Sequence, residues 1–196
     1  MDLTKRQLQI IDAAGKLLAS GGIQNLTTKK LAIEMGFSEA ALYRHFKSKD
    51  DIIFAMLTYL ASNIDKRINE IINSDMDAIE KLKTLFNNQF TFFNKNTHYL
   101  VAIFSDGLWE NNEKTHQAVK QIMAVKQKHL NFIFEEGQNK NKITSNVNSK
   151  TLTHMIMGIF RLHMLKWKMN DFKFDLINSG NQLIADFIEL IKFRTE

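Results

Sequence analysis

The apolar positions of this 196-residue chain repeat at helical spacing along almost its whole length. Apolar residues that lie three and four positions apart share one face of an α-helix. The chain contains no proline, which is compatible with long uninterrupted helices. We therefore expect an all-α protein of about nine helices, with no strands. The pattern predicts helices over 4–20, 27–35, 38–46, 48–72, 76–94, 99–109, 113–136, 150–169 and 174–193.

Residues 27–51, TTKKLAIEMGFSEAALYRHFKSKDD, predict two short helices joined by a tight turn. Gly36 suits the left-handed conformation that closes a helix, and Ser38 offers a hydroxyl that caps the next one. Leu42 and Phe46, four positions apart, point inward together. The opposite face is small, aromatic and basic, which suits the major groove of DNA. A plain helical hairpin with a solvated face is the alternative.

The distribution of charge favours DNA over that alternative. The chain carries a net charge of +5. Residues 1–50 hold eight basic and five acidic residues, whereas the other 146 residues hold 18 basic and 16 acidic ones. More than half of the cationic surplus therefore lies in the first quarter of the chain, which contains the helix-turn-helix, as phosphate binding requires.

The N-terminal motifs, taken together, resemble the DNA-binding domain of the TetR family of bacterial one-component regulators. The resemblance covers about residues 4–52, and the rest of the chain agrees with the family in length and helical character alone. It implies a homodimeric, ligand-responsive repressor of a palindromic operator, with a DNA-binding domain at 1–47 and a ligand-binding and dimerisation domain at 48–196. The matching residues are Ile10-Ile11-Asp12-Ala13-Ala14, Leu17-Leu18, Gly22, Thr27-Thr28, Leu31-Ala32, Gly36-Phe37-Ser38, Leu42-Tyr43-Arg44-His45-Phe46 and Lys49.

Twelve residues of this segment are candidates for DNA contact. Arg44 suits either guanine or phosphate. Glu39 suits either a cytosine amino group or the positive end of the helix dipole, and the dipole is favoured. Tyr43 and Lys49 match family positions that contact phosphate, although packing against the first helix is an alternative for Tyr43, and His45 is either a phosphate donor or a packed side chain. The candidates are Thr27, Thr28, Lys29, Ser38, Glu39, Ala40, Ala41, Tyr43, Arg44, His45, Lys47 and Lys49.

An apolar or amphipathic small molecule is the expected effector. Thirteen of the fifteen phenylalanines follow residue 50, and such residues line apolar pockets as well as ordinary cores. His163 interrupts an apolar stripe that includes Phe160, which fits either a ligand contact or a satisfied core histidine. Met123 is expected on the inward face of the helix predicted over 113–136. The candidate pocket residues are Phe86, Phe90, Phe93, Phe104, Met123, His163 and Trp167.

The last two predicted helices are apolar on more than one side, so they need cover on more than one side. A second copy of the chain would supply it, and deep burial is the alternative. Residues 138–149 are polar and rich in asparagine, which is typical of a mobile loop or a short ordered connector. The candidate dimer residues are Met155, Gly158, Leu162, Leu165, Leu183, Phe187 and Ile191.

Several classes of function are disfavoured. The chain has no cysteine, which excludes disulfides and cysteine–zinc sites. Its histidines lack metal-ligand spacing, and it has neither a phosphate-cradling glycine loop nor a nucleophile elbow. We expect no catalytic residue, metal or cofactor. Without a signal core or a long apolar run, we expect a cytoplasmic protein with no membrane partner. A DNA-bound protein that acts mainly through another protein is the alternative function, and an enzyme is a more distant one.

Overall fold

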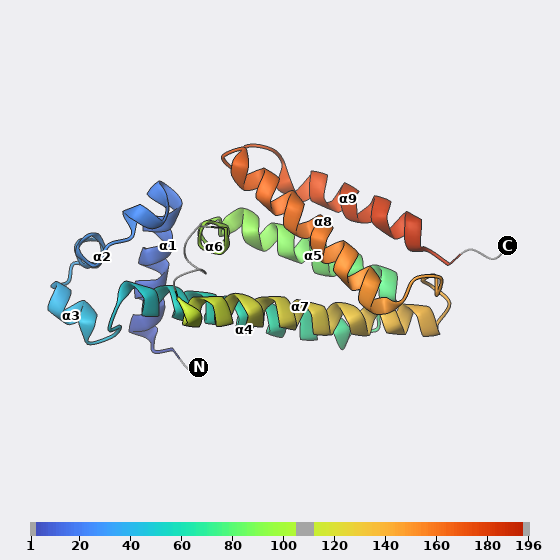
Figure 1. Cartoon of the computed structure of the whole chain (residues 1–196), viewed down its shortest axis with the longest axis horizontal. Helices are drawn as coiled ribbons and strands as arrows, with labels where there is room; N and C mark the ends of the chain where they lie inside the picture. The colour runs from blue at the N-terminus through green and yellow to red at the C-terminus, as the bar shows by residue number, and fades with distance from the viewer. Residues whose placement is uncertain (1–2, 105–111, 194–196) are drawn as a thin grey trace. The chain divides into compact units, whose positions relative to one another are not determined.

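A computed structural model of the chain describes residues 3–104 and 112–193, and within these ranges it is all-α (Figure 1). The β-pairing seen in the described residues is one isolated bridge between Ile143 and Lys192. None of the described helices is long and apolar enough to cross a membrane. The described helices are α1 (Lys5–Asn25), α2 (Thr28–Met35), α3 (Glu39–Tyr43), α4 (Lys49–Ile72), α5 (Ala78–Lys95), α6 (His98–Ile103), α7 (Glu113–Asn139), α8 (Ser149–Met169) and α9 (Leu176–Ile191).

Side-chain caps define most helix starts. Thr4 and Gln7 form a capping box at the start of α1, and Asn148 and Asp175 cap α8 and α9. The predicted break at residues 21–22 is a kink inside α1, where both glycines leave helical geometry and the helix then resumes. The predicted end of α6 near residues 106–107 lies outside the described residues.

The chain forms two compact units. Unit 1 comprises residues 1–63 and 96–122, and unit 2 comprises residues 64–95 and 123–196. This division differs from a boundary at residue 47, because α6 packs on α1 within unit 1. The start of α7 also binds the start of α4, where Lys114 Nζ lies 3.1 Å from Asp51 Oδ1. Both α4 and α7 contribute to both units.

Gly15 permits the close contact between α1 and α6 in unit 1. A Cβ atom at this buried position would lie 2.8 Å from His98 Cδ2, closer than carbon atoms approach. Glycine costs about 1 kcal/mol of helix propensity relative to alanine. The His98 ring therefore explains a glycine that the sequence alone leaves unexplained. Burial lowers the pKa of His98 below its ordinary value.

In unit 2, α9 packs on α5 and lies beside α8 (Figure 1). Phe187 and Ile191 are only 4% and 5% exposed, so their prediction as dimer residues is wrong. They share the inward face of α9 with Ile184 and Ile188, since each of the four lies three or four positions from two of the others. Periodicity assigns residues to a face but does not say which of two apolar faces is covered.

The candidate dimer residues on α8, by contrast, are exposed or half-buried in the single chain. Met155 and Leu162 are 47% and 54% exposed, Gly158 is exposed, and Leu165 is half-buried. Leu183 of α9 is also half-buried. These five residues remain available on the surface of the single chain.

Residues 138–149 form an ordered connector rather than a mobile loop. The Gln138 side-chain amide donates to the carbonyl oxygens of Thr144 and Val147, at 2.9 and 2.7 Å. Ile143 is fully buried and pairs with Lys192. A single buried isoleucine and one amide thus fix a segment whose composition is polar.

Candidate nucleic-acid interface

The backbone of residues 27–46 has the geometry of a helix-turn-helix. Thr27 caps α2 by accepting from the Lys30 amide. Gly36 then adopts the left-handed conformation (φ 64°, ψ 34°), and its N–H closes the helix. Ser38 caps α3 by accepting from the Ala41 amide at 3.2 Å. The predicted roles of Gly36 and Ser38 are confirmed.

The inward face fixes this motif against α1. Leu31, Ala32 and Leu42 are buried, and Phe46 is 7% exposed. Gln7 of α1 donates a hydrogen bond to the His45 carbonyl oxygen at 3.3 Å. The helix α3 is shorter than the predicted range 38–46, and its last residues continue as a turn. The outward face is therefore held at a set orientation by a packed core.

All twelve candidate contact residues reach the surface. Ala41, His45, Thr28 and Lys49 are half-buried, and the rest are exposed. Tyr43 is 48% exposed, so its ring is not enclosed by the first helix. The exposed candidates are Thr27, Lys29, Ser38, Glu39, Ala40, Tyr43, Arg44 and Lys47.

Glu39 is engaged within the motif. Its Oε2 atom accepts from the Thr28 hydroxyl at 2.9 Å, which links α3 to the first residue of α2. The carboxylate also lies in the first turn of α3, where negative charge stabilises a helix. This geometry favours the structural interpretation of Glu39 over recognition of a cytosine.

The positive face retains accessible cations. Arg44 and Lys47 are exposed and form no ion pair with a described residue. The two aspartates that follow Lys49 are already bonded: Asp50 to the Asn112 amide at 2.9 Å, and Asp51 to Lys114. The hydrogen bond from Lys114 lowers the pKa of Asp51. The charge of Asp51 is thereby offset by Lys114 beside the surface that would face phosphate.

His45 is packed rather than free. Its ring stacks on Phe37 with the centroids 6.5 Å apart, and the side chain is half-buried. Phe37 in turn lies 4.6 Å from the guanidinium carbon of Arg6. Contact between His45 and phosphate therefore requires the exposed part of the ring.

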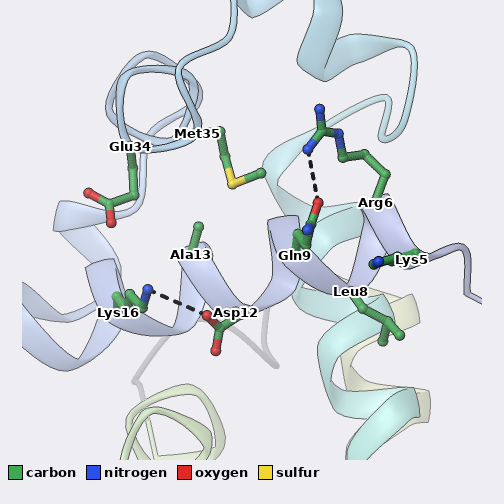
Figure 2. Close-up of a pocket in the computed structure, with 9 residues that line it drawn as sticks. All are labelled: Lys5, Arg6, Leu8, Gln9, Asp12, Ala13, Lys16, Glu34 and Met35. Atoms are coloured by element: carbon green, nitrogen blue, oxygen red, sulfur yellow. Dashed lines mark hydrogen bonds and ion pairs between the residues drawn. The ribbon is translucent and has the colours of Figure 1, made fainter.

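A shallow groove lies between α1 and α2 on another part of unit 1 (Figure 2). Its charges are of both signs: Lys16 lies 3.5 Å from Asp12, and Arg6 donates to the uncharged amide of Gln9 at 2.9 Å. Such a mixed, open surface has no clear preference for an anion or a cation. It is lined by Lys5, Arg6, Leu8, Gln9, Asp12, Ala13, Lys16, Glu34 and Met35.

Four of the seven candidate pocket residues lie close together in unit 2. The rings of Phe86, Phe90 and Phe93 lie 5.6, 5.5 and 6.3 Å from the ring of Phe160. His163 lies 5.9 Å from Phe90. Phe160 is the centre of this aromatic cluster, which we define as Phe86, Phe90, Phe93 and Phe160. Sequence reasoning placed Phe160 in an apolar stripe but not among the candidates.

The other three candidates lie elsewhere or are otherwise engaged. Phe104 belongs to unit 1. Met123 is 46% exposed, so the expectation that it faces inward is wrong. Trp167 is buried, and its indole N–H already donates to the Phe174 carbonyl oxygen at 3.0 Å.

His163 has a protein partner. Its Nε2 atom lies 3.1 Å from Ser179 Oγ, and that hydroxyl donates to the Asp175 carbonyl oxygen at 2.5 Å. Since the hydroxyl proton is already used, Ser179 accepts from the Nε2–H of His163. Burial lowers the pKa of His163, with the nearby Lys166 charge acting in the same direction. This geometry favours the satisfied-histidine interpretation.

Family models account for nearly the whole chain. Residues 10–56 match the model described as bacterial regulatory proteins of the tetR family, and residues 58–189 match that of the YsiA-like protein C-terminal region. The chain belongs to the TetR family. This TetR-family chain is a DNA-binding transcriptional regulator, and the resemblance seen in residues 4–52 is confirmed.

Individual relatives cover the same length. The chain is 26% identical over 179 residues to the fatty acid metabolism regulator protein of Bacillus subtilis, covering 91% of this chain and 92% of that one. It is 27% identical over 168 residues to the nucleoid occlusion factor SlmA of Shewanella loihica, covering 86% and 85%. The structure of the transcriptional regulator FadR from Bacillus subtilis in complex with stearoyl-CoA aligns with a TM-score of 0.80 at 25% identity, over 92% and 97% of the two chains.

Proposed function

We propose that this TetR-family regulator is a homodimeric repressor that an amphipathic fatty-acyl compound releases from a palindromic operator. One observation carries the effector class: an aromatic cluster of four phenylalanines lies in unit 2 of a chain whose relatives include a fatty acid metabolism regulator. Aromatic side chains of this kind suit an acyl chain. The protein would act by binding rather than by catalysis, in the cytoplasm.

The DNA contacts divide into two groups. Arg44 and the small pair Ala40 and Ala41 would read base edges, since the two alanines lie on α3, Arg44 directly follows it, and all three reach the surface. Thr28, Tyr43 and Lys49 would position the motif on phosphates. We retain residues 1–47 as the segment that meets DNA and residues 48–196 as the segment for effector and dimer.

The dimer would form through α8 and α9. Met155, Gly158, Leu162 and Leu165 follow one another at spacings of three and four, so they make one stripe on α8. An exposed apolar stripe of this kind is typical of an interaction surface. Two paired copies would place their α3 helices, which would enter the major groove, at half-sites about 34–36 Å apart.

A gel-shift titration tests the proposal. The protein is mixed with DNA from upstream of its own gene, with and without dodecanoyl-CoA. We expect salt-sensitive binding, protection of two symmetric half-sites, and release by the acyl compound. Leu162→Glu should give monomers in light scattering and lose operator binding, whereas the exposed Lys173→Glu change should leave the dimer intact. Absence of binding to every upstream fragment would contradict the proposal.

A second candidate function has its own support. The similarity to nucleoid occlusion factors extends over 86% of the chain, compared with 91% for the fatty acid metabolism regulator protein. In this candidate function, the protein would bind DNA and act mainly through contact with another protein. Genome-wide binding that is unaffected by dodecanoyl-CoA, together with no change in transcripts on deletion, would favour this candidate.

A further inference from the structure

Lys126 occupies an inward position on α7. Ile122, Leu130 and Ile133 stand four before, four after and seven after it, and these three residues are buried. Residues at this spacing share one face of a helix. The charged side chain therefore enters the interior of unit 2 from a stripe that is otherwise apolar.

The ammonium group of Lys126 lies against the aromatic cluster. Its Nζ atom is 4.2 Å from the ring centroid of Phe160, from α8, and 5.5 Å from that of Phe93, from α5. Part of the side chain remains exposed, whereas the ammonium end is removed from water. Desolvation, with the charge of Arg67 second, lowers the pKa of Lys126 to about 7. Contact with the faces of aromatic rings replaces only part of the hydration energy that a buried cation loses.

The carboxylates of this region are already engaged. Among the described residues none lies within 4.0 Å of Lys126 Nζ. Asp65 of α4 binds His129 at 2.6 Å, and Glu136 of α7 binds Lys81 at 2.8 Å. Lys81 is thus an interior lysine with a counter-ion, and Lys126 is an interior lysine without one.

The charge of a second cation acts on Lys126, and a buried amide lies one turn from Phe93, whose ring Lys126 contacts. Arg67 of α4 donates to Asn88 Oδ1 at 2.7 Å and lies 4.1 Å from the Phe92 centroid. Gln89 is 1% exposed and stands one turn before Phe93 on the same face of α5. Its Oε1 atom has no hydrogen-bond partner among the described residues. A buried polar group in this state calls for a ligand or water.

We propose that Lys126, with Arg67 and Gln89, binds the anionic group of an amphipathic effector whose apolar body contacts the aromatic cluster. The proposal rests on the proposed function for the apolar part and adds the chemical class of the head. A carboxylate or a phosphate would form the ion pair that the protein itself does not provide, in a setting where charge-assisted hydrogen bonds are strong. An uncharged ligand would leave the ammonium unpaired.

Three probes with the same chain distinguish the sources of the anion: dodecanoate, dodecanoyl-CoA and dodecanol. Binding is measured by isothermal titration calorimetry on the full-length protein at pH 7. We expect at least one anionic probe to bind roughly tenfold or more tightly than dodecanol. Preference for dodecanoate assigns a carboxylate to Lys126, and preference for dodecanoyl-CoA assigns a phosphate.

The variant Lys126→Met keeps the length of the side chain and removes the charge. It should lower affinity for the preferred anion about tenfold or more and leave dodecanol binding unchanged. Lys128→Met, an exposed lysine on the same helix, is the matched control. The melting temperature of Lys126→Met should hold or rise, because an unpaired interior charge is removed. A fall in melting temperature together with unchanged anion affinity would assign Lys126 a structural role and overturn the proposal.

Failure of this proposal is separable from failure of the proposed function. If all three probes bind equally in the wild type and in Lys126→Met and still release operator DNA, the effector class stands and the anion site is wrong. If none of the probes binds while operator binding persists, both the fatty-acyl effector and the anion site are wrong.

Discussion

Unit 1 and unit 2 place their cationic side chains in opposite surroundings. In unit 1, the side chains of Arg44 and Lys47 are exposed to solvent on the surface of the helix-turn-helix, whose short helices α2 and α3 are capped. In unit 2, Lys81 and Lys126 enter the interior. An exposed cation costs little to maintain and is ready for phosphate, whereas an interior cation requires a partner. Lys81 has that partner in the protein, and our proposal gives Lys126 one in the effector.

The largest expected effect is on the free energy of unfolding, through the buried ion pair between Lys81 and Glu136. Glu136→Ala should lower the free energy of unfolding by about 3 kcal/mol, because it leaves the Lys81 ammonium buried without its carboxylate. Lys81 is 5% exposed and Glu136 is 16% exposed. Urea denaturation followed by circular dichroism measures the change. Lys173→Ala, which breaks an exposed pair with Asp171, should change stability by less than about 0.5 kcal/mol. Equal effects would remove the contrast between interior and surface cations.

On the surface of unit 1, Arg44→Ala should weaken operator binding about 10- to 100-fold without changing the unfolding free energy. Fluorescence anisotropy with operator and scrambled DNA gives both affinity and specificity. A larger loss on the operator than on scrambled DNA would indicate base reading. An equal loss on both, with a smaller salt dependence, would indicate a phosphate contact. Lys173→Ala, at an exposed cation of unit 2, serves as the control.

A smaller effect is expected where unit 1 brings two helices into contact. Gly15→Ala should lower the free energy of unfolding by about 1 kcal/mol net, since overlap with His98 outweighs the gain in helix propensity. Combining it with His98→Ala in a double-mutant cycle should restore part of the loss. Gly158→Ala, whose Cβ meets nothing within 4 Å in one chain, is the control and should not destabilise. Additive losses in the cycle would show that the ring is not the cause.

The smallest effect is on pH dependence, and each unit contributes to it through one histidine. Burial lowers the folded-state pKa of His98 and of His163 below 6.5, so the unfolded chain binds more protons between the two values. Stability is then fully present above pH 6.5 and declines as pH falls below it. His98→Gln and His163→Gln should each flatten the unfolding free energy between about pH 6.5 and 5. A profile that is unchanged in both variants would contradict this origin.

How much the sequence predicts differs between the two units. The helix-turn-helix is local: its caps, its turn glycine and its inward pair lie within twenty residues, so their spacing predicts the geometry. The role of Glu39 needed a contact with Thr28, eleven positions away. The reason for Gly15 needed His98, which no local pattern links to it.

The interior of unit 2 was harder to predict because periodicity was read from apolar residues alone. Met123 was assigned to the inward face of α7 because it is apolar, yet it is 46% exposed. The true stripe passes through Lys126, a charged residue that such a reading omits. A lysine four positions from two buried apolar residues, Ile122 and Leu130, was the available signal. The choice of covered face on α9 required the packing of α5, which the sequence does not reveal.

The hydrogen bond between Thr28 and Glu39 has a consequence for engineering. It joins the first turns of α2 and α3, so the two helices form one exchangeable part. Grafting α3 alone from a relative that lacks an acid at position 39 would leave the Thr28 hydroxyl without its acceptor and change the docking angle. A chimera intended to recognise a foreign operator should therefore exchange residues 27–46 as a block.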